Sequence, residues 1–248
     1  ILENMTHTLK HRGPDSHGFH VKNPIGLGAR RLSIIDLNNG HQPIHNEDKT
    51  LWMVFNGEIY NYKSLRETLM QSGHRFYTHG DSEVIIHLYE KYGEECVRYL
   101  DGMFSFAVWD ESNQTLFVAR DRMGIKPLYY FYDPYIFLCA SELKSIVVHP
   151  SVSRDIDPVG IHQFLQHRFI SPPKTIFRKI YKLPAGHYLK VRNGHPTIQQ
   201  YWDVPMPTDR SKLETQDLDS LYESIFCSLE ESVKSHMISD VPIGAYLS

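Results

Sequence analysis

The spacing of apolar residues in the first part of the chain changes from a strand-like to a helical pattern. Short apolar runs at 31–37 and 51–56 are rich in β-branched and aromatic residues, which is typical of strands. Apolar residues then recur at helical spacing over 65–70 and from about 82 to 92, so two helices are predicted there. Asp81 directly precedes the second helix and is its predicted N-cap.

Residues 102–202 return to apolar runs separated by turn residues, in the manner of a meander. The predicted strands lie at 103–109, 115–119, 128–132, 135–140, 186–192 and 197–202. A helix is predicted near 159–167. Segment 103–109 is apolar at both odd and even positions, which is typical of a strand covered on both faces. We therefore expect its sheet to lie between two other layers.

The last part of the chain has the pattern of a second unit. Residues 203–210 contain two prolines and little periodicity, which predicts a linker. A long amphipathic helix follows and ends near His236, and the apolar run 241–247 predicts a buried strand. We interpret the chain as three parts, namely a domain at 1–202, a linker at 203–212 and the beginning of another domain at 213–248.

The composition is that of a globular protein and excludes some function classes. Hydrophobic residues make up 41% of the 248 residues, and the formal net charge is −3. This balance, without a cluster of Lys and Arg, argues against a nucleic-acid-binding protein. The longest unbroken apolar run has six residues, whereas a membrane-spanning helix needs about 20. We therefore expect no transmembrane helix and no membrane partner.

The cysteines and histidines give no sign of a metal site or a disulfide framework. Cys96, Cys139 and Cys227 have neither paired nor metal-ligand spacing, and a sparse, odd count suits a reducing compartment. All three lie in apolar-periodic segments, which predicts buried, inert thiols. The fifteen histidines form no His-plus-Cys cluster, so no metal site is predicted.

Three clusters combine small and charged residues in a way that suggests chemistry. They are HRGPD at 11–15 together with RLSIID at 31–36, FNGEIYN at 55–61, and GDSE at 80–83. Each also has a purely structural interpretation. Asn56-Gly57 can form a tight turn, Asp81 can cap a helix, and Arg31 can be a solvated charge.

Taken together, the clusters resemble the class II glutamine amidotransferase domain found at the N-terminus of glutamine-hydrolysing asparagine synthetases. Further matching motifs are GMFSFA at 102–107, RDRMGIKPL at 120–128, SELK at 141–144, PAG at 184–186 and DVPIGAYLS at 240–248. The resemblance implies an α+β fold, an αββα sandwich of the N-terminal-nucleophile hydrolase type. It also implies that the first helix and strand of an α/β ATP-pyrophosphatase-like domain follow.

The activity that the resemblance implies is glutamine-dependent asparagine synthesis. In this family an N-terminal cysteine hydrolyses glutamine to glutamate and ammonia, and the ammonia then reacts with aspartate that ATP has activated. Glutamine, aspartate and ATP are therefore the expected partners, and the family leaves a homodimer open. ATP with Mg²⁺ is the cofactor expected of the full-length enzyme, with none in the glutaminase domain, and the expected location is the cytoplasm.

Specific residues match the glutamine-binding positions of the family. The side-chain amide of Asn56 and the backbone N–H of Gly57 match the oxyanion hole. Arg31 matches the position that binds the α-carboxylate, where a guanidinium fork can hold two oxygens. Asp81 and Glu58 match the positions that face the α-ammonium. The other residues expected to line the pocket are Leu32, Ser33, Ile34 and Ile35.

The two ends of the chain bear on activity. The resemblance places the family's nucleophilic cysteine before Ile1 and a glycine-rich pyrophosphate loop after Ser248. Leu247 matches a position that binds ATP in the family. The chain alone is therefore expected to lack glutaminase activity. Three alternatives stay open. The protein could be an amidotransferase with a sugar or peptide acceptor, a non-catalytic binding module of the same fold, or a hydrolase that uses Cys139.

Overall fold

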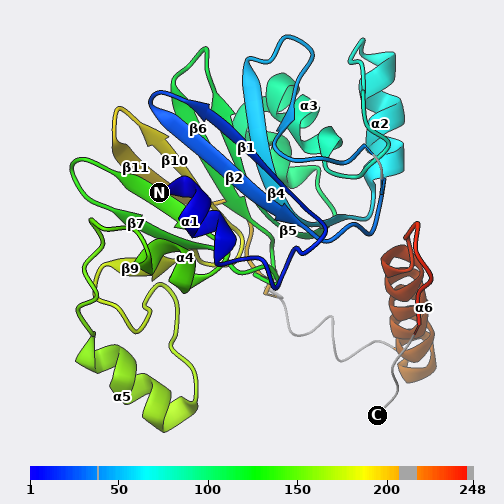
Figure 1. Ribbon diagram of the computed structural model, residues 1–248. Helices are drawn as coiled ribbons and strands as arrows, with labels where there is room; N and C mark the ends of the chain where they lie inside the picture. The colour runs from blue at the N-terminus through cyan, green and yellow to red at the C-terminus, as the bar shows by residue number, and fades with distance from the viewer. Residues whose placement is uncertain (38, 207–216, 245–248) are drawn as a thin grey trace.

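The computed structural model describes residues 1–37, 39–206 and 217–244 (Figure 1). Its largest sheet has six antiparallel strands in the order β11-β10-β6-β5-β4-β3. The strands are β3 Ile44–His45, β4 Leu51–Ile59, β5 Gly102–Asp110, β6 Thr115–Arg120, β10 His187–Arg192 and β11 His195–Gln200. The strands predicted in these regions are confirmed, with ends shifted by one to three residues.

A second layer of strands packs on one face of the six-stranded sheet. It consists of the hairpin β1 Ser16–Lys22 and β2 Ile25–Arg31, and of the three-stranded sheet β7 Tyr129–Tyr132, β8 Phe137–Ala140 and β9 Ile180–Lys182. Leu27 of β2 and Tyr130 of β7 pack with Trp109 and Val118 of the large sheet. The expected meander is thus divided between two sheets, because β7 pairs with β8 and β9 rather than with β6.

Helices cover the two outer faces of this pair of layers (Figure 1). α2 Tyr62–Gln71 and α3 Glu83–Tyr92, with the 3₁₀ segment η1 Gly93–Arg98, cover the large sheet. α1 Leu2–His7 and α4 Leu143–Val147 cover the second layer, where Ile146 packs on Phe131. The order of layers is αββα, as the sequence predicted. The helix α5 Pro158–His167 projects from this sandwich.

Two local predictions near the start of these elements are wrong. Of the predicted strand 31–37, only Arg31 belongs to a strand, and the rest is a loop that folds back around the Arg31 side chain. Asp81 is not the N-cap of α3, because Ser82 occupies that position and makes no side-chain capping bond. Asp81 instead accepts a hydrogen bond from Ile59 N across the layer boundary.

The C-terminal part contains the predicted amphipathic helix as α6 Leu218–His236, to one side of the sandwich (Figure 1). None of its residues is buried, and Leu229 is 60% exposed. Its apolar face therefore has no partner among the described residues. This exposure also makes the prediction of a buried Cys227 wrong, while Cys96 is buried and Cys139 is half-buried.

The predicted buried strand at 241–247 is wrong where the structure describes it. Residues 241–244 form no strand, and Ile243 is 50% exposed, because nothing in the described chain pairs with this segment. Residues 245–247 and the linker residues 207–212 lie outside the described part. Among the described helices, none is both long enough and apolar enough to cross a membrane.

Candidate active site

A cavity of about 400 Å³ lies between the two layers of strands. Its walls include parts of α1, β5 and β8, and the predicted residues in them come from β2, the loop that follows β2, the end of β4 and the loop that leads into α3. The predicted residues that line it are Arg31, Leu32, Ile34, Ile35, Asn56, Gly57, Glu58 and Asp81. Ser33 is the exception, since it is not in the wall and its N–H donates to Asp15 Oδ2 at 2.8 Å. Leu247 lies outside the described residues.

Asn56 presents an unused hydrogen-bond donor at this cavity. Its Nδ2 is buried and has no hydrogen-bond partner among the described residues. A buried donor left unpaired costs about 1–3 kcal/mol, so such a group calls for a ligand or water acceptor. Asn56 and Gly57 both lie within β4, opposite Ser105 and Phe104 of β5, so the tight-turn interpretation of this pair is wrong.

Gly57 is required by the neighbouring strand. A Cβ at this position would lie 2.1 Å from the carbonyl oxygen of Met103 and 2.8 Å from Phe104 Cα. Both are backbone atoms of the paired strand β5, so no small shift of a side chain could make room. Glycine therefore keeps β4 and β5 in register at the point where Asn56 faces the cavity.

Arg31 organises the loop that follows it. Its Nη2 donates to the carbonyl oxygens of Ile35 and Asp36, at 2.7 Å each. Burial lowers the pKa of Arg31, while Asp36 and Asp81 oppose that effect, and a guanidinium remains charged in proteins. Because Nη2 uses both of its protons on the loop and Nη1 donates one to Leu37 O at 3.5 Å, a ligand carboxylate is left with Nε and the second proton of Nη1.

Two carboxyl groups give the cavity an anionic side. Asp81 is 7% exposed, and burial raises its pKa to about 6, with a further upward contribution from the charge of Glu58. Burial also raises the pKa of Glu58, against the effect of Lys126 and His236. Arg31 favours the ionised form of Asp81. The cavity therefore combines basic groups that include Arg31, the two carboxylates and a free amide donor, which are complementary to a zwitterionic amino acid with a polar side chain.

A family model described as a glutamine amidotransferase domain matches residues 1–202. The chain belongs to the glutamine amidotransferase domain family. The predicted family resemblance is therefore confirmed.

Several curated relatives match this amidotransferase domain and the residues that follow it. Asparagine synthetase [glutamine-hydrolyzing] 1 of Bacillus subtilis (strain 168) is 40% identical, over 100% of this chain and 38% of the relative. Putative asparagine synthetase [glutamine-hydrolyzing] 2 of Methanocaldococcus jannaschii is 35% identical, over 100% of this chain and 51% of the relative. Amidase chry2 of Gibberella zeae is 36% identical, over 100% of this chain and 36% of the relative. The chain thus spans between about a third and a half of these relatives.

A solved structure supports the fold of the amidotransferase domain. Glutamine phosphoribosylpyrophosphate amidotransferase from B. subtilis, complexed with ADP and GMP, superposes with a TM-score of 0.53 at 20% identity. The match covers 73% of this chain and 36% of that one. At this identity the likeness concerns the fold alone. It confirms the predicted α+β fold with antiparallel sheets.

Three residues in or near the amidotransferase site were missed in the sequence, and of these only Lys126 lines the cavity. Asp36 is buried, and its Oδ2 accepts a hydrogen bond from the N–H of His79 at 2.7 Å. The N–H of Asp36 donates to Asp240 Oδ2, also at 2.7 Å. Lys126 lines the cavity, and its only sequence signal is its place in the motif at 120–128.

The third missed residue, Tyr60, has a buried hydroxyl without a partner in the described chain. Burial raises the pKa of Tyr60 to about 12. Its ring lies 4.1 Å from that of His236, between centroids. No periodicity distinguishes Tyr60 from the other aromatic residues.

The alternative that relies on Cys139 is not supported by the environment of its thiol. Cys139 does line the cavity of the amidotransferase domain. Burial raises the pKa of Cys139 to about 12, so the thiol is protonated at neutral pH, whereas a cysteine nucleophile attacks as the thiolate. No charged neighbour contributes to this pKa. Cys139 therefore has the properties of a packing residue.

Proposed function

We propose that the full-length protein hydrolyses glutamine in this cavity. The observation that carries the proposal is the buried Nδ2 of Asn56, which has no partner among the described residues and lies in the same cavity as Arg31 and Asp81. In the complex that we propose, the side-chain amide of glutamine would lie against Asn56, the α-carboxylate against Arg31, and the α-ammonium against Asp81 and Glu58. An ammonium offsets the mutual repulsion of the two carboxylates.

The proposed chemistry is nucleophilic attack followed by hydrolysis. A cysteine thiolate, which the family resemblance places before Ile1 in the full-length protein, attacks the amide carbon and forms a tetrahedral intermediate. The Asn56 amide and the Gly57 N–H stabilise the negative charge on its oxygen. Ammonia leaves, and water then cleaves the glutamyl thioester to release glutamate. Leu2 and Met5 of α1 line the same cavity, which supports this placement of the nucleophile.

We infer that the ammonia serves asparagine synthesis. Relatives named asparagine synthetases, at 34% to 40% identity, support aspartate as the acceptor. ATP with Mg²⁺ would activate that aspartate, and Leu247, the residue matched to ATP, lies outside the described part. The relatives named amidases, one of them 36% identical, support a second candidate in which another molecule receives the ammonia.

Contacts between the segment after α6 and the loop that follows β2 support coupling of glutamine hydrolysis to asparagine synthesis. Asp240 N donates to Ile34 O at 3.1 Å, and Asp36 N donates to Asp240 Oδ2 at 2.7 Å. Ile34 lines the cavity. A change in the conformation of the segment after α6 would therefore alter the loop beside the proposed glutamine site.

The test compares glutamine-dependent with ammonium-dependent asparagine formation by the full-length protein. Asn56→Ala should lower glutamine hydrolysis by about 10²–10³-fold, since one oxyanion donor is lost, and leave the ammonium-dependent rate unchanged. Gln166→Ala, which removes an exposed amide on α5, is the matched control and should alter neither rate. Unchanged glutamine hydrolysis in Asn56→Ala would exclude the proposed oxyanion hole. Ammonia release without asparagine would support the second candidate.

A further inference from the structure

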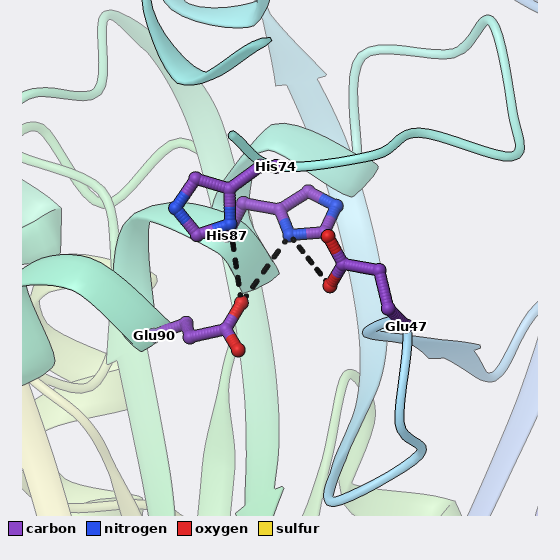
Figure 2. A group of neighbouring side chains, drawn as sticks. All are labelled: Glu47, His74, His87 and Glu90. Carbon is purple, nitrogen blue, oxygen red and sulfur yellow. Dashed lines mark hydrogen bonds and ion pairs between the residues drawn. The ribbon is translucent and has the colours of Figure 1, made fainter. Parts of the chain in front are cut away.

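A second cluster of titratable side chains lies near the other end of α3, away from the cavity (Figure 2). Glu47 comes from the connection between β3 and β4, His74 from the loop after α2, and His87 and Glu90 from α3. The four side chains point toward one another, and one donor atom of each lies within 4.8 Å of all the others. None of the four lines the glutamine cavity.

Three of the distances within this cluster match those between the ligands of a tetrahedral metal ion and are long for hydrogen bonds. Glu90 Oε2 lies 3.3 Å from His74 Nδ1 and 3.5 Å from His87 Nδ1, and Glu47 Oε2 lies 3.6 Å from His87 Nδ1. Hydrogen bonds from nitrogen to oxygen are usually 2.7–3.2 Å long. Zinc bonds of about 2.0–2.2 Å in a tetrahedron separate neighbouring donor atoms by about 3.3–3.6 Å.

His87 directs its second nitrogen at a carboxylate, as a metal-binding imidazole usually does. The His87 side chain is fully buried, and its Nε2 lies 3.5 Å from Glu83 Oε1, with no hydrogen-bond partner among the described residues. Glu83 is itself buried and accepts the N–H groups of Tyr77 and Thr78, at 2.9 and 2.7 Å. A histidine that binds a metal through one nitrogen commonly directs the other at a carboxylate, which fixes the ring. Nδ1 of His87 is thereby turned toward the cluster.

The two glutamates are oriented by neighbours as well. Glu47 uses Oε1 to accept the N–H of Arg75 at 2.7 Å, which leaves Oε2 toward the cluster. Oε1 of Glu90 accepts a hydrogen bond from Asn46 Nδ2 at 3.3 Å. Its Oε2 is therefore free to face the two histidines. Each carboxylate therefore offers one oxygen to the centre.

We propose that Glu47, His74, His87 and Glu90 bind one zinc ion. Two imidazoles and two carboxylates supply the nitrogen and oxygen donors that zinc accepts, and four protein ligands complete a tetrahedron, as in structural sites. The side chains of Glu47 and Glu90 are 35% and 36% exposed, so an ion can enter from solvent. The ion would join the β3–β4 connection and the loop after α2 to α3.

No metal-binding motif is visible in the sequence, because the proposed ligands are scattered at positions 47, 74, 87 and 90. Only His87 and Glu90 are close in the chain, at a spacing that is common on helices. The site has a consequence for the cavity, since α3 also carries Glu83, which holds the loop at 77–78 just before Asp81. The ion would thus stabilise α3 and the loop that leads into it. It would have no part in the reaction.

The test measures zinc binding by the full-length protein after removal of bound metals with a chelator. A titration with zinc chloride against a chromophoric competitor should give one tight site per chain, and zinc should raise the melting temperature. Glu90→Gln and His74→Gln should each weaken zinc binding at least 100-fold and abolish the thermal shift. Glu67→Gln and His195→Gln remove an exposed carboxylate and an exposed imidazole elsewhere, and both should bind like the wild type.

Three results would overturn the zinc site. The first is the absence of stoichiometric zinc binding by the wild type. The second is equal zinc affinity in the cluster variants and the controls, since the ion would then lie elsewhere. The third is thermal stabilisation by Mg²⁺ without any by Zn²⁺. Circular dichroism and an unchanged KM for glutamine show that Glu90→Gln is folded, so a loss of zinc affinity in that variant reports on the ligand.

Discussion

Replacing Asp81 with asparagine should stabilise the protein while impairing its site. The carboxyl group is 7% exposed, and burial raises its pKa from 3.8 to about 6. Ionising it in the folded protein at neutral pH therefore costs about 3 kcal/mol, from about 2.2 pKa units at 1.36 kcal/mol each. Asparagine carries no charge, and its oxygen can still accept the hydrogen bond that Ile59 N gives to Asp81 at 2.9 Å.

The pH dependence of this effect has a definite sign. Because the folded pKa lies above the unfolded one, the carboxyl group is protonated in both states below pH 3.8 and costs nothing there. Between pH 3.8 and about 6 the unfolded chain ionises first, so the wild type loses stability as pH rises. Asp81→Asn should thus be more stable by up to about 3 kcal/mol at pH 7.5, and nearly equal to the wild type at pH 4.

Urea unfolding of the full-length protein at pH 4 and pH 7.5 measures this difference. Asp155→Asn, which neutralises an exposed carboxylate, is the matched control and should show no such gain. Glutamine hydrolysis by Asp81→Asn should fall through a raised KM, since the α-ammonium loses a charged partner. A gain in stability that is the same at both pH values, or a loss at pH 7.5, would refute the argument that a buried charge is responsible.

Two further predictions concern neighbouring positions. Arg31→Lys should both raise the KM for glutamine and lower the melting temperature, because a lysine cannot replace both contacts to the carbonyls of Ile35 and Asp36. Each of these hydrogen bonds is worth about 1.5–3 kcal/mol. A raised KM with an unchanged melting temperature would contradict the role of Arg31 in holding the loop. Gly57→Ala should destabilise by about 1–3 kcal/mol or more because its Cβ meets β5 backbone, whereas in Gly80→Ala the nearest atom is 3.5 Å away and urea unfolding should match the wild type.

The elements that the sequence predicted well are those fixed by local periodicity. α2 and α3 follow from apolar residues at helical spacing, and the coverage of β5 on both faces follows from its apolar residues at odd and even positions. The αββα arrangement and most glutamine-site residues came from linked motifs rather than periodicity. These motifs contain the predicted site residues, which lie in short segments of β2, β4 and the loop that leads into α3.

The failures share a physical cause, which is that tertiary contacts outweighed the local pattern. Residues 32–37 are apolar enough for a strand, but the Arg31 guanidinium binds their carbonyl groups and bends the chain into a loop. Asp81 has the sequence position of a helix cap, but the Ile59 N–H from β4 takes its carboxylate. The cluster of Glu47, His74, His87 and Glu90 exists only in three dimensions.

The rate constant kcat/KM for ammonia release by the full-length protein, measured with L-glutamine and with 4-carbamoylbutanoate, tests the central claim most directly. The second compound is glutamine without its α-ammonium. If Asp81 and Glu58 bind that group, its loss should lower kcat/KM by about 10- to 150-fold, the equivalent of one charge-assisted contact. In Asp81→Asn the two compounds should differ far less. Equal kcat/KM for both compounds in the wild type would contradict the assignment of this cavity to glutamine.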